Sequence, residues 1–174
     1  MTERQPEYNT SGPEHIALGN LSFGMYFPSE IITNEQIEQW NVTTKNGTLL
    51  TASYIHEKIG IARRFKAHKN ETPIDMGIEA ALAAGNLQDV TAIIASTSYP
   101  LGKNVSEEIG VRLGIEPNFH LDIHAACSGF VRGLVYMKEH EKELQGIKVL
   151  FVATEKYSPT LTDLSKGGTT TDSS

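Results

Sequence analysis

The sequence lacks the features that mark several large classes of protein. Its single cysteine cannot form an internal disulfide, and no stretch approaches the roughly 20 consecutive apolar residues of a membrane-spanning helix. It also lacks an excess of positive charge, because 15 Lys and Arg stand against 21 Asp and Glu, for a net charge of −6. We therefore expect neither a membrane span nor nonspecific binding to nucleic acid or anionic membranes.

What is present indicates a globular protein. The 174 residues are within the size of one domain, and 39% of them are apolar and 21% charged. This composition argues against disorder, collagen and coiled coil as classes for the whole chain. Residues 1–15 are polar and lack the apolar stretch of a signal peptide, so we expect a flexible leader there and a reducing cytoplasm as the location.

Apolar strand patterns alternate with helical patterns along the chain. Thr33 and Gln36 have the spacing of a capping box, and Gly60 is well placed for a left-handed helix end. The alternation predicts an α/β fold with a parallel or mixed sheet that helices cover on both faces. The expected strands are 16–23, 90–96, 119–123 and 149–153, and the expected helices are 33–40, 52–59, 73–85, 104–113 and 130–144.

The single cysteine, Cys127, lies between a predicted strand and a predicted helix. Small residues on both sides of it permit a sharp turn that exposes a nucleophile. A helix N-terminus favours thiolate over thiol, and its N–H groups can hold a developing oxyanion. Because free cysteine is also among the most buried residue types, close packing in a core remains the alternative.

The same segment carries a family resemblance. The run 122–130 (DIHAACSGF), followed by Gly133-Leu134 and by 153–158 (ATEKYS), resembles the N-terminal half of β-ketoacyl-acyl-carrier-protein synthase III, of the thiolase superfamily. The segments 16–28, 59–64 (IGIARR) and 94–98 (IASTS) fit in the same order. The resemblance covers about residues 16–168 and implies a thiolase-like fold, with 16–174 as an N-terminal half-module and the C-terminal half absent from this chain.

The resemblance implies a reaction in two steps. Cys127 would accept an acyl group from a coenzyme A or carrier-protein thioester, and the acyl group would then be condensed with a malonyl-type thioester, as in fatty acid or polyketide biosynthesis. The family supplies a His and an Asn for the second step from its C-terminal half, so we expect the isolated chain to be inactive. The alternatives are a thiolase-fold acyltransferase of specialised metabolism that does not decarboxylate, and a non-catalytic half-module that acts as a structural or dimerisation partner.

The resemblance also implies positions that hold coenzyme A, namely Tyr54, Lys58 and Lys166. The family has Arg where Lys58 and Lys166 stand, and Lys keeps the attraction for phosphate without the bidentate geometry of Arg. Lys58 also opens a basic stretch that reaches Lys69, which can dock an acidic carrier protein or can be a solvated surface. Lys103 stands where the family often has a Phe that crosses the dimer interface, so the acyl-chain specificity does not carry over.

The expected ligands and partners follow from the same resemblance. We expect no cofactor, with coenzyme A or phosphopantetheine thioesters as substrates. The expected partners are acyl-CoA, acyl carrier protein, a second copy in a homodimer, and the C-terminal half of the same protein or a complementary chain. His124 and His120 are expected to be structural or pocket-rim residues. The other histidines lack metal-ligand spacing, so we expect no metal site.

Overall fold

Three parallel strands form the centre of the larger lobe of the protein. The computed structural model describes residues 19–98 and 101–156. In it, β3 (Val90–Thr97) lies between β4 (Phe119–His124) and β5 (Lys148–Ala153), and both neighbours run parallel to it. All three strands therefore end at the same edge of the sheet, which is where open α/β sheets place their ligands.

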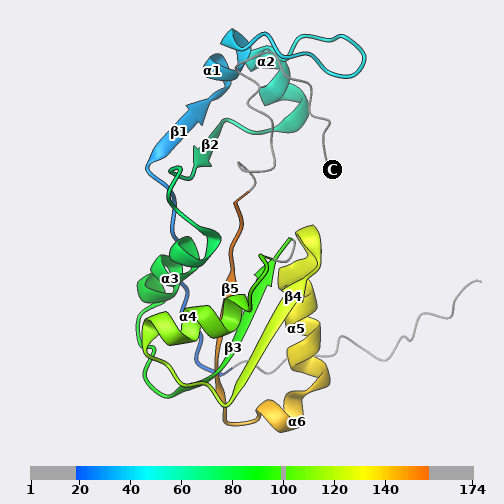
Figure 1. Ribbon diagram of the computed structural model, residues 1–174. Coiled ribbons are helices and arrows are strands. Elements are labelled where there is room, and N and C mark those ends of the chain that lie inside the picture. The colour runs from blue at the N-terminus through cyan, green and yellow to red at the C-terminus, as the bar shows by residue number, and fades with distance from the viewer. Residues whose placement is uncertain (1–18, 99–100, 157–174) are drawn as a thin grey trace, which may run out of the picture.

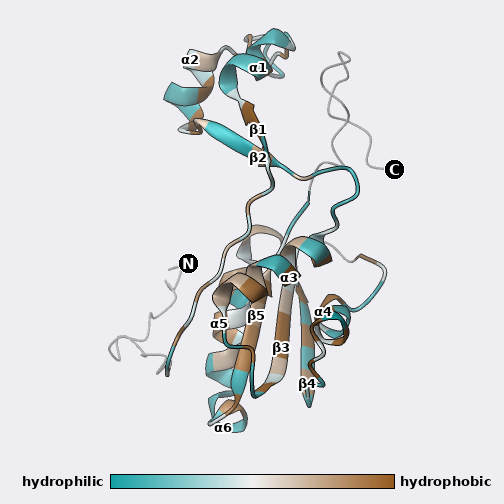
Figure 2. Ribbon diagram, turned by 90° about the vertical axis from the view of Figure 1, so that its left-hand side faces the viewer, coloured by the Kyte–Doolittle hydropathy of each residue, from teal (hydrophilic) through white to brown (hydrophobic). Residues whose placement is uncertain are grey.

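Helices cover both faces of this sheet (Figure 1), as the sequence predicts. α3 (Pro73–Ala84) and α4 (Val105–Leu113) pack together on one face, and α5 (Gly129–Glu139) packs on the other. Figure 2 shows that the strands are the most hydrophobic part of this lobe. The buried core lies between the sheet and the α3–α4 layer, and consists of Ile74, Ile78, Ala81, Val90, Ile93, Ala95, Val105, Ile109, Leu150 and Val152.

A second, smaller lobe contains an antiparallel pair of strands and short helices (Figure 1). β1 (Glu30–Thr33) pairs with β2 (Arg63–Lys66). α1 (Asn34–Gln39) begins with the predicted capping box between Thr33 and Gln36. α2 (Ala52–Tyr54) continues directly into the π-helix η1 (Ile55–Ile59), which ends at Gly60 in the left-handed conformation (φ 77°).

The sequence-based assignment of elements is wrong in three places. Residues 19–23 of the predicted strand 16–23 form no strand, because no other described strand lies alongside to share hydrogen bonds with them. The β1–β2 pair is not predicted, since its strands are short and carry charged residues. The predicted helix 130–144 is divided at His140 into α5 and α6 (Glu141–Leu144).

Some expectations concern residues that the structure does not describe. The leader 1–15, Lys166 and the end of the chain lie outside the described residues. Within residues 19–98 and 101–156, no helix combines the length and the hydropathy that crossing a bilayer requires.

Candidate active site

Cys127 lies at the edge of the sheet where the three parallel strands end. It is the middle residue of η2 (Ala126–Ser128), a single 3₁₀ turn between the end of β4 and the start of α5. Its thiol is free and its side chain is exposed. Within the described part of the chain, Cys127 therefore does not pack in a core, and its role as the nucleophile stays a prediction.

The turn around Cys127 has the sharp geometry that the small residues predict. Ala126 has a positive φ of 45°, which non-glycine residues seldom adopt. The Ser128 hydroxyl donates to the carbonyl of Ala125 (2.7 Å) and closes the turn. A Cβ on Gly129 would lie 1.9 Å from Ser96 Oγ, so only glycine lets α5 start this close to β3. Such backbone strain beside a reactive group is typical of functional turns.

Hydrogen bonds join the ends of the three strands next to this turn. Thr97 Oγ1 of β3 and His124 Nδ1 of β4 are 2.9 Å apart. The Ser98 N–H donates to Glu155 Oε2 beyond β5 (2.6 Å). His124 thus has a structural partner and stands on the rim of a groove, which agrees with its expected role.

Lys156 is a buried residue that sequence reasoning missed. Its ammonium donates to the carbonyl oxygens of His68 (2.8 Å), Lys69 (3.2 Å) and Glu71 (2.5 Å). These bonds fasten residues 68–71 to the end of β5. The only signal in the sequence is a lysine three residues after an apolar strand, which ordinarily indicates a solvated end.

A groove of about 660 Å³ runs beside the turn, along β4 and α5. Ala125 and Ser128 line its end nearest to Cys127, while Cys127 itself is not among the lining residues. The groove is therefore adjacent to the nucleophile and separate from it. Among the residues with described positions, no group of three or more His, Cys, Asp or Glu side chains is arranged to hold a metal ion.

Two of the three residues expected to hold coenzyme A, Tyr54 and Lys58, lie in the other lobe, and the third, Lys166, lies outside the described residues. Tyr54 is the last residue of α2 and is half-buried, and Lys58 is exposed in η1, four residues further on. Figure 1 shows α2 in the lobe opposite β4 and α5, between which Cys127 lies. The structure thus places Tyr54 and Lys58 on one helical segment, and their binding role remains a prediction.

Some residues of the basic stretch that begins at Lys58 form hydrogen bonds or ion pairs with neighbouring side chains. Arg64 donates to Asn34 Oδ1 (2.9 Å), and Lys66 pairs with Glu30 across the β1–β2 ribbon (3.0 Å). Lys58, Arg63 and Lys69 are exposed and form no ion pair with any described residue. Part of the stretch is therefore a structural surface, and part is open to an anionic ligand.

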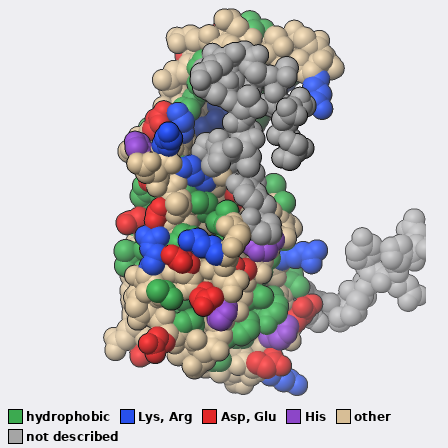
Figure 3. Space-filling view, viewed as in Figure 1, with side chains coloured by type: hydrophobic (Ala, Val, Ile, Leu, Met, Phe, Trp, Pro, Cys, Tyr) green, Lys and Arg blue, Asp and Glu red, His purple; other side chains and the backbone are tan. Residues whose placement is uncertain are grey.

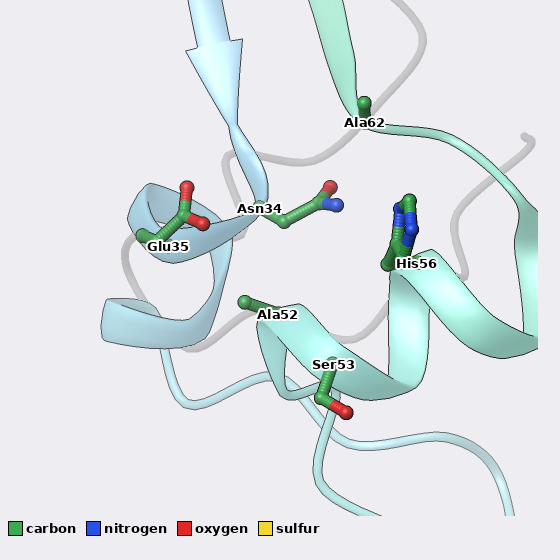
Figure 4. A pocket seen from close by; sticks show the side chains of 6 residues that line it. All are labelled: Asn34, Glu35, Ala52, Ser53, His56 and Ala62. Atoms are coloured by element: carbon green, nitrogen blue, oxygen red, sulfur yellow. The ribbon is translucent and has the colours of Figure 1, made fainter.

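The smaller lobe contains a hollow of about 280 Å³ (Figure 4). Asn34 on its wall already bonds to the Ile61 carbonyl and to Arg64, and Ser53 bonds to Glu57. Two of the polar residues on its wall, Asn34 and Ser53, therefore already have hydrogen-bond partners. It is lined by Asn34, Glu35, Ala52, Ser53, His56 and Ala62.

Comparison with known proteins shows what the chain is similar to. No family model matches it. Among curated proteins, β-ketoacyl-[acyl-carrier-protein] synthase III of Acidiphilium cryptum is 34% identical over 142 residues, which are 78% of this chain and 42% of the relative. The enzyme of the same name from Bartonella bacilliformis is 29% identical over 142 residues, with the same coverage of 78% and 42%.

Solved structures agree with the sequence comparison. The 3-oxoacyl-[acyl-carrier-protein] synthase III of Aquifex aeolicus has a TM-score of 0.67 and 28% identity, and covers 81% of this chain and 46% of its own. The synthase III of Thermus thermophilus has a TM-score of 0.69 and 27% identity, with 84% and 45% covered. The chain spans less than half the length of these relatives. The resemblance in the sequence is confirmed: over the part that it matches, this chain is related to β-ketoacyl-[acyl-carrier-protein] synthase III and has its thiolase-like α/β fold.

Proposed function

We propose that this chain is the nucleophile-bearing half of a ketosynthase III-like acyltransferase. The observation that carries the proposal is the exposed Cys127 on a strained turn at the carboxyl edge of the sheet. In the first step, the Cys127 sulfur attacks the carbonyl carbon of an acyl thioester. The thiol of coenzyme A or of a carrier protein leaves, and the acyl group stays on Cys127.

The second step joins this acyl group to a malonyl-type thioester. Loss of carbon dioxide leaves a carbanion, which attacks the acyl carbonyl on Cys127 and releases the Cys127 thiolate and a β-ketoacyl thioester. This step needs hydrogen-bond donors for the thioester oxygen. We propose that a further half, in the same protein or in a complementary chain, supplies them, because the relatives are more than twice the length of the matched segment.

The proposed substrates and partners rest on the resemblance to the family and on the exposed basic residues of the chain. Tyr54, Lys58 and Lys166 would hold the nucleotide of coenzyme A, and Lys58, Arg63 and Lys69 would attract its phosphates or an acidic carrier protein. The outer edge of β4, which no described strand covers, would pair with a second copy in a homodimer. The proposed location is the cytoplasm.

The proposal is tested by labelling Cys127. Protein that contains both halves is incubated with radiolabelled acyl-coenzyme A, and peptide mass spectrometry locates the acyl group. We expect label on the peptide that carries Cys127 and none in a Cys127→Ala variant. Absence of label from the wild-type peptide would contradict the proposal and favour a non-catalytic half-module.

A malonyl thioester then separates the two enzymatic alternatives. The decarboxylating reaction releases one carbon dioxide for each β-ketoacyl product. Condensation or transfer without carbon dioxide would instead identify a non-decarboxylating acyltransferase of the same fold.

A further inference from the structure

Two short segments of chain connect the smaller lobe to the larger one. Residues 25–29 lead into β1 and residues 67–72 lead from β2 to α3, and neither segment forms a helix or a strand (Figure 2). The elements of the smaller lobe pack mainly on one another. Contacts that hold the two connecting segments therefore set how the smaller lobe sits on the larger one.

A carboxylate joins the two connecting segments. The Tyr26 hydroxyl in the first segment donates to Glu71 Oε1 in the second. The other carboxylate oxygen, Glu71 Oε2, accepts the N–H of His68 (2.5 Å). These two hydrogen bonds, first the one from Tyr26 and then the one from His68, lower the pKa of Glu71. The folded state thus favours an ionised carboxylate at the point where the two segments meet.

Lys156 ties this point to the larger lobe. It follows β5 by three residues and is buried. Its ammonium donates to the carbonyl oxygens of three residues of the second connecting segment, His68 (2.8 Å), Lys69 (3.2 Å) and Glu71 (2.5 Å). An ammonium has three N–H groups to donate, so the three carbonyls match it. An apolar side chain in its place would leave these carbonyls without that donor.

The residues just before Lys156 are fixed to the larger lobe. The Thr154 hydroxyl donates to the Pro73 carbonyl at the start of α3 (2.5 Å), and Glu155 Oε2 accepts the N–H of Ser98, which follows β3 (2.6 Å). Lys156 therefore extends from the same edge of the sheet that carries the Cys127 turn. It connects this edge to both segments that lead to the smaller lobe.

We propose that Lys156 is a positioning residue, whose ammonium holds the smaller lobe at the distance from Cys127 that lets one acyl-coenzyme A reach both lobes. The inference rests on the proposed function, in which Tyr54 and Lys58 of the smaller lobe hold the nucleotide. Coenzyme A carries its nucleotide and its thioester at opposite ends, so the spacing of the lobes decides whether the bound thioester meets the thiol. A thioester of N-acetylcysteamine has no nucleotide and does not depend on this spacing.

Two acyl donors test the proposal on protein that contains both halves. With either donor, the Cys127 sulfur attacks the acyl carbonyl and the thiol of the donor leaves. We expect Lys156→Met to lower the second-order rate constant for acylation by acyl-coenzyme A about tenfold. The rate constant with acyl-N-acetylcysteamine should stay that of the wild type. A loss confined to the long donor is a result that general destabilisation would not give.

Two further variants control this experiment. Lys156→Arg keeps the positive charge and the N–H donors, so it should recover part of the rate with acyl-coenzyme A. Lys148→Met is the matched control, because Lys148 also donates to a loop carbonyl, that of Gln88 (2.7 Å), but at the other end of β5. It should change the rate with neither donor.

The spacing itself is measured on the full 174-residue chain, whose single cysteine is Cys127. Gln39→Cys adds a second thiol at an exposed residue of α1 in the smaller lobe. Spin labels on both thiols, in protein diluted with unlabelled chain, give the distance by double electron–electron resonance. We expect one narrow distribution of distances, which Lys156→Met broadens and Lys148→Met does not. If Lys156→Met loses the wild-type circular dichroism, Tyr26→Phe replaces it with the same expected results.

The inference is overturned if the variant leaves the distribution of distances or the rate with acyl-coenzyme A unchanged, or if it slows both donors equally. Wild-type protein that neither donor acylates contradicts the proposed function, and the role of Lys156 in acyl transfer falls with it. The distance measurement needs no acyl transfer, so it still decides in that case whether Lys156 holds the two lobes together.

Discussion

At the scale of single residues, Asp122 of β4 takes over the capping of α4. Its carboxylate accepts the N–H groups of Val105 (2.6 Å) and Ser106 (2.8 Å). Asn104, the residue before the helix, makes no capping bond with its side chain and donates to Glu107 instead. An anion at a helix N-terminus is also favoured by the helix dipole. The strand that leads to Cys127 is thereby fixed to α4.

The same helix start contains a buried hydroxyl without a partner. Ser106 is fully buried, and its Oγ has no hydrogen bond among the described residues. Because a buried unsatisfied polar group costs about 1–3 kcal/mol, we expect Ser106→Ala to raise the free energy of unfolding by about 1 kcal/mol. Urea denaturation measures this change in the free energy of unfolding. Thr154→Val is the contrast: its buried hydroxyl donates to the Pro73 carbonyl (2.5 Å), so that variant should be destabilised.

The lowered pKa of Asp75 predicts how the stability of the folded state changes in acid. Hydrogen bonds from the Thr72 hydroxyl and N–H, and then Arg112, lower its pKa from 3.8 to about 2. The folded state thus favours the ionised carboxylate, and the stabilisation is complete above about pH 4 and disappears as the pH falls through 2. Because the Asp75 side chain is 34% exposed, solvent screening reduces its contribution to the free energy of unfolding to about 1 kcal/mol.

The measurement compares the wild type with Asp75→Asn by urea denaturation across pH. We expect a difference in unfolding free energy of about 1 kcal/mol at pH 7 that disappears near pH 2. Val111→Ala, a change at an exposed residue without a titratable group, should show no such dependence. A difference that is constant with pH would contradict the assignment.

Residue-level features were predictable from the sequence where both partners are close in the chain. The Thr33–Gln36 capping box spans three residues and was predicted correctly, and the turn around Cys127 is built from its immediate neighbours. Asp122 reaches partners 16 and 17 residues away, and Lys156 reaches carbonyls 85 to 88 residues away. Tertiary folding alone creates such contacts, so no local pattern could show them.

At the scale of elements, α5 approaches the sheet through its glycines. A Cβ on Gly133 would lie 2.3 Å from Cζ of Phe151 in β5. Phe151 cannot easily turn away, because its ring stacks on that of Phe130 with centroids 5.2 Å apart. The distance between α5 and β5 therefore depends on the absence of a side chain at this position.

We expect Gly133→Ala to lower the free energy of unfolding by about 1–3 kcal/mol, because the new methyl group overpacks the contact with Phe151. Phe151→Leu in the same chain should recover part of the loss by making room, which thermal or urea denaturation would show. Val131→Ala, on the exposed side of the same helix, is the control and should have little effect. Equal losses with and without Phe151→Leu would contradict the packing argument.

The elements of the main sheet were predictable, and those of the smaller lobe were less so. β3 is a continuous apolar run, and α3 and α4 have clear starts and end near glycines, so their patterns are strong. β1 and β2 are four residues each and pair across about 30 residues of chain. The widening of 55–59 into a π-helix has no sequence signature of its own.

At the scale of the whole molecule, apolar surface is exposed in separate places. Apolar side chains reach the surface of the lower lobe in Figure 3, among acidic and histidine side chains. Phe130, Val131 and Val135 of α5 are each about half exposed or more. The most regular case is the extended segment 19–28, where every second residue is a large apolar one and is 56% to 78% exposed. These residues are Leu21, Phe23, Met25 and Phe27.

This segment explains why residues 19–23 of the predicted strand form no strand although they carry part of a strand-like apolar pattern. Apolar residues at every second position are typical of a strand with one buried face. Gly24 packs on the backbone of α3, and the Tyr26 hydroxyl donates to Glu71, so these two even positions face the protein. Among the odd positions, Phe27 lies against the ring of Phe65 in β2, with centroids 4.8 Å apart, while Leu21, Phe23 and Met25 are 58% to 78% exposed. A sequence pattern indicates which face of a segment is apolar. It does not indicate whether another part of the structure packs on that face.

An extended segment that exposes apolar side chains, and that no described strand pairs with, is a template for association. We therefore expect the chain to form species larger than a dimer, and Phe23→Lys/Met25→Lys to reduce their fraction several-fold with unchanged circular dichroism. Light scattering coupled to size-exclusion chromatography measures the fraction. Val111→Lys, which places the same charge at an exposed apolar residue of α4, is the control and should leave the larger species in place. If the double variant associates as strongly as the wild type while its fold is intact, the segment is not the template, and the exposed face of α5 becomes the surface responsible.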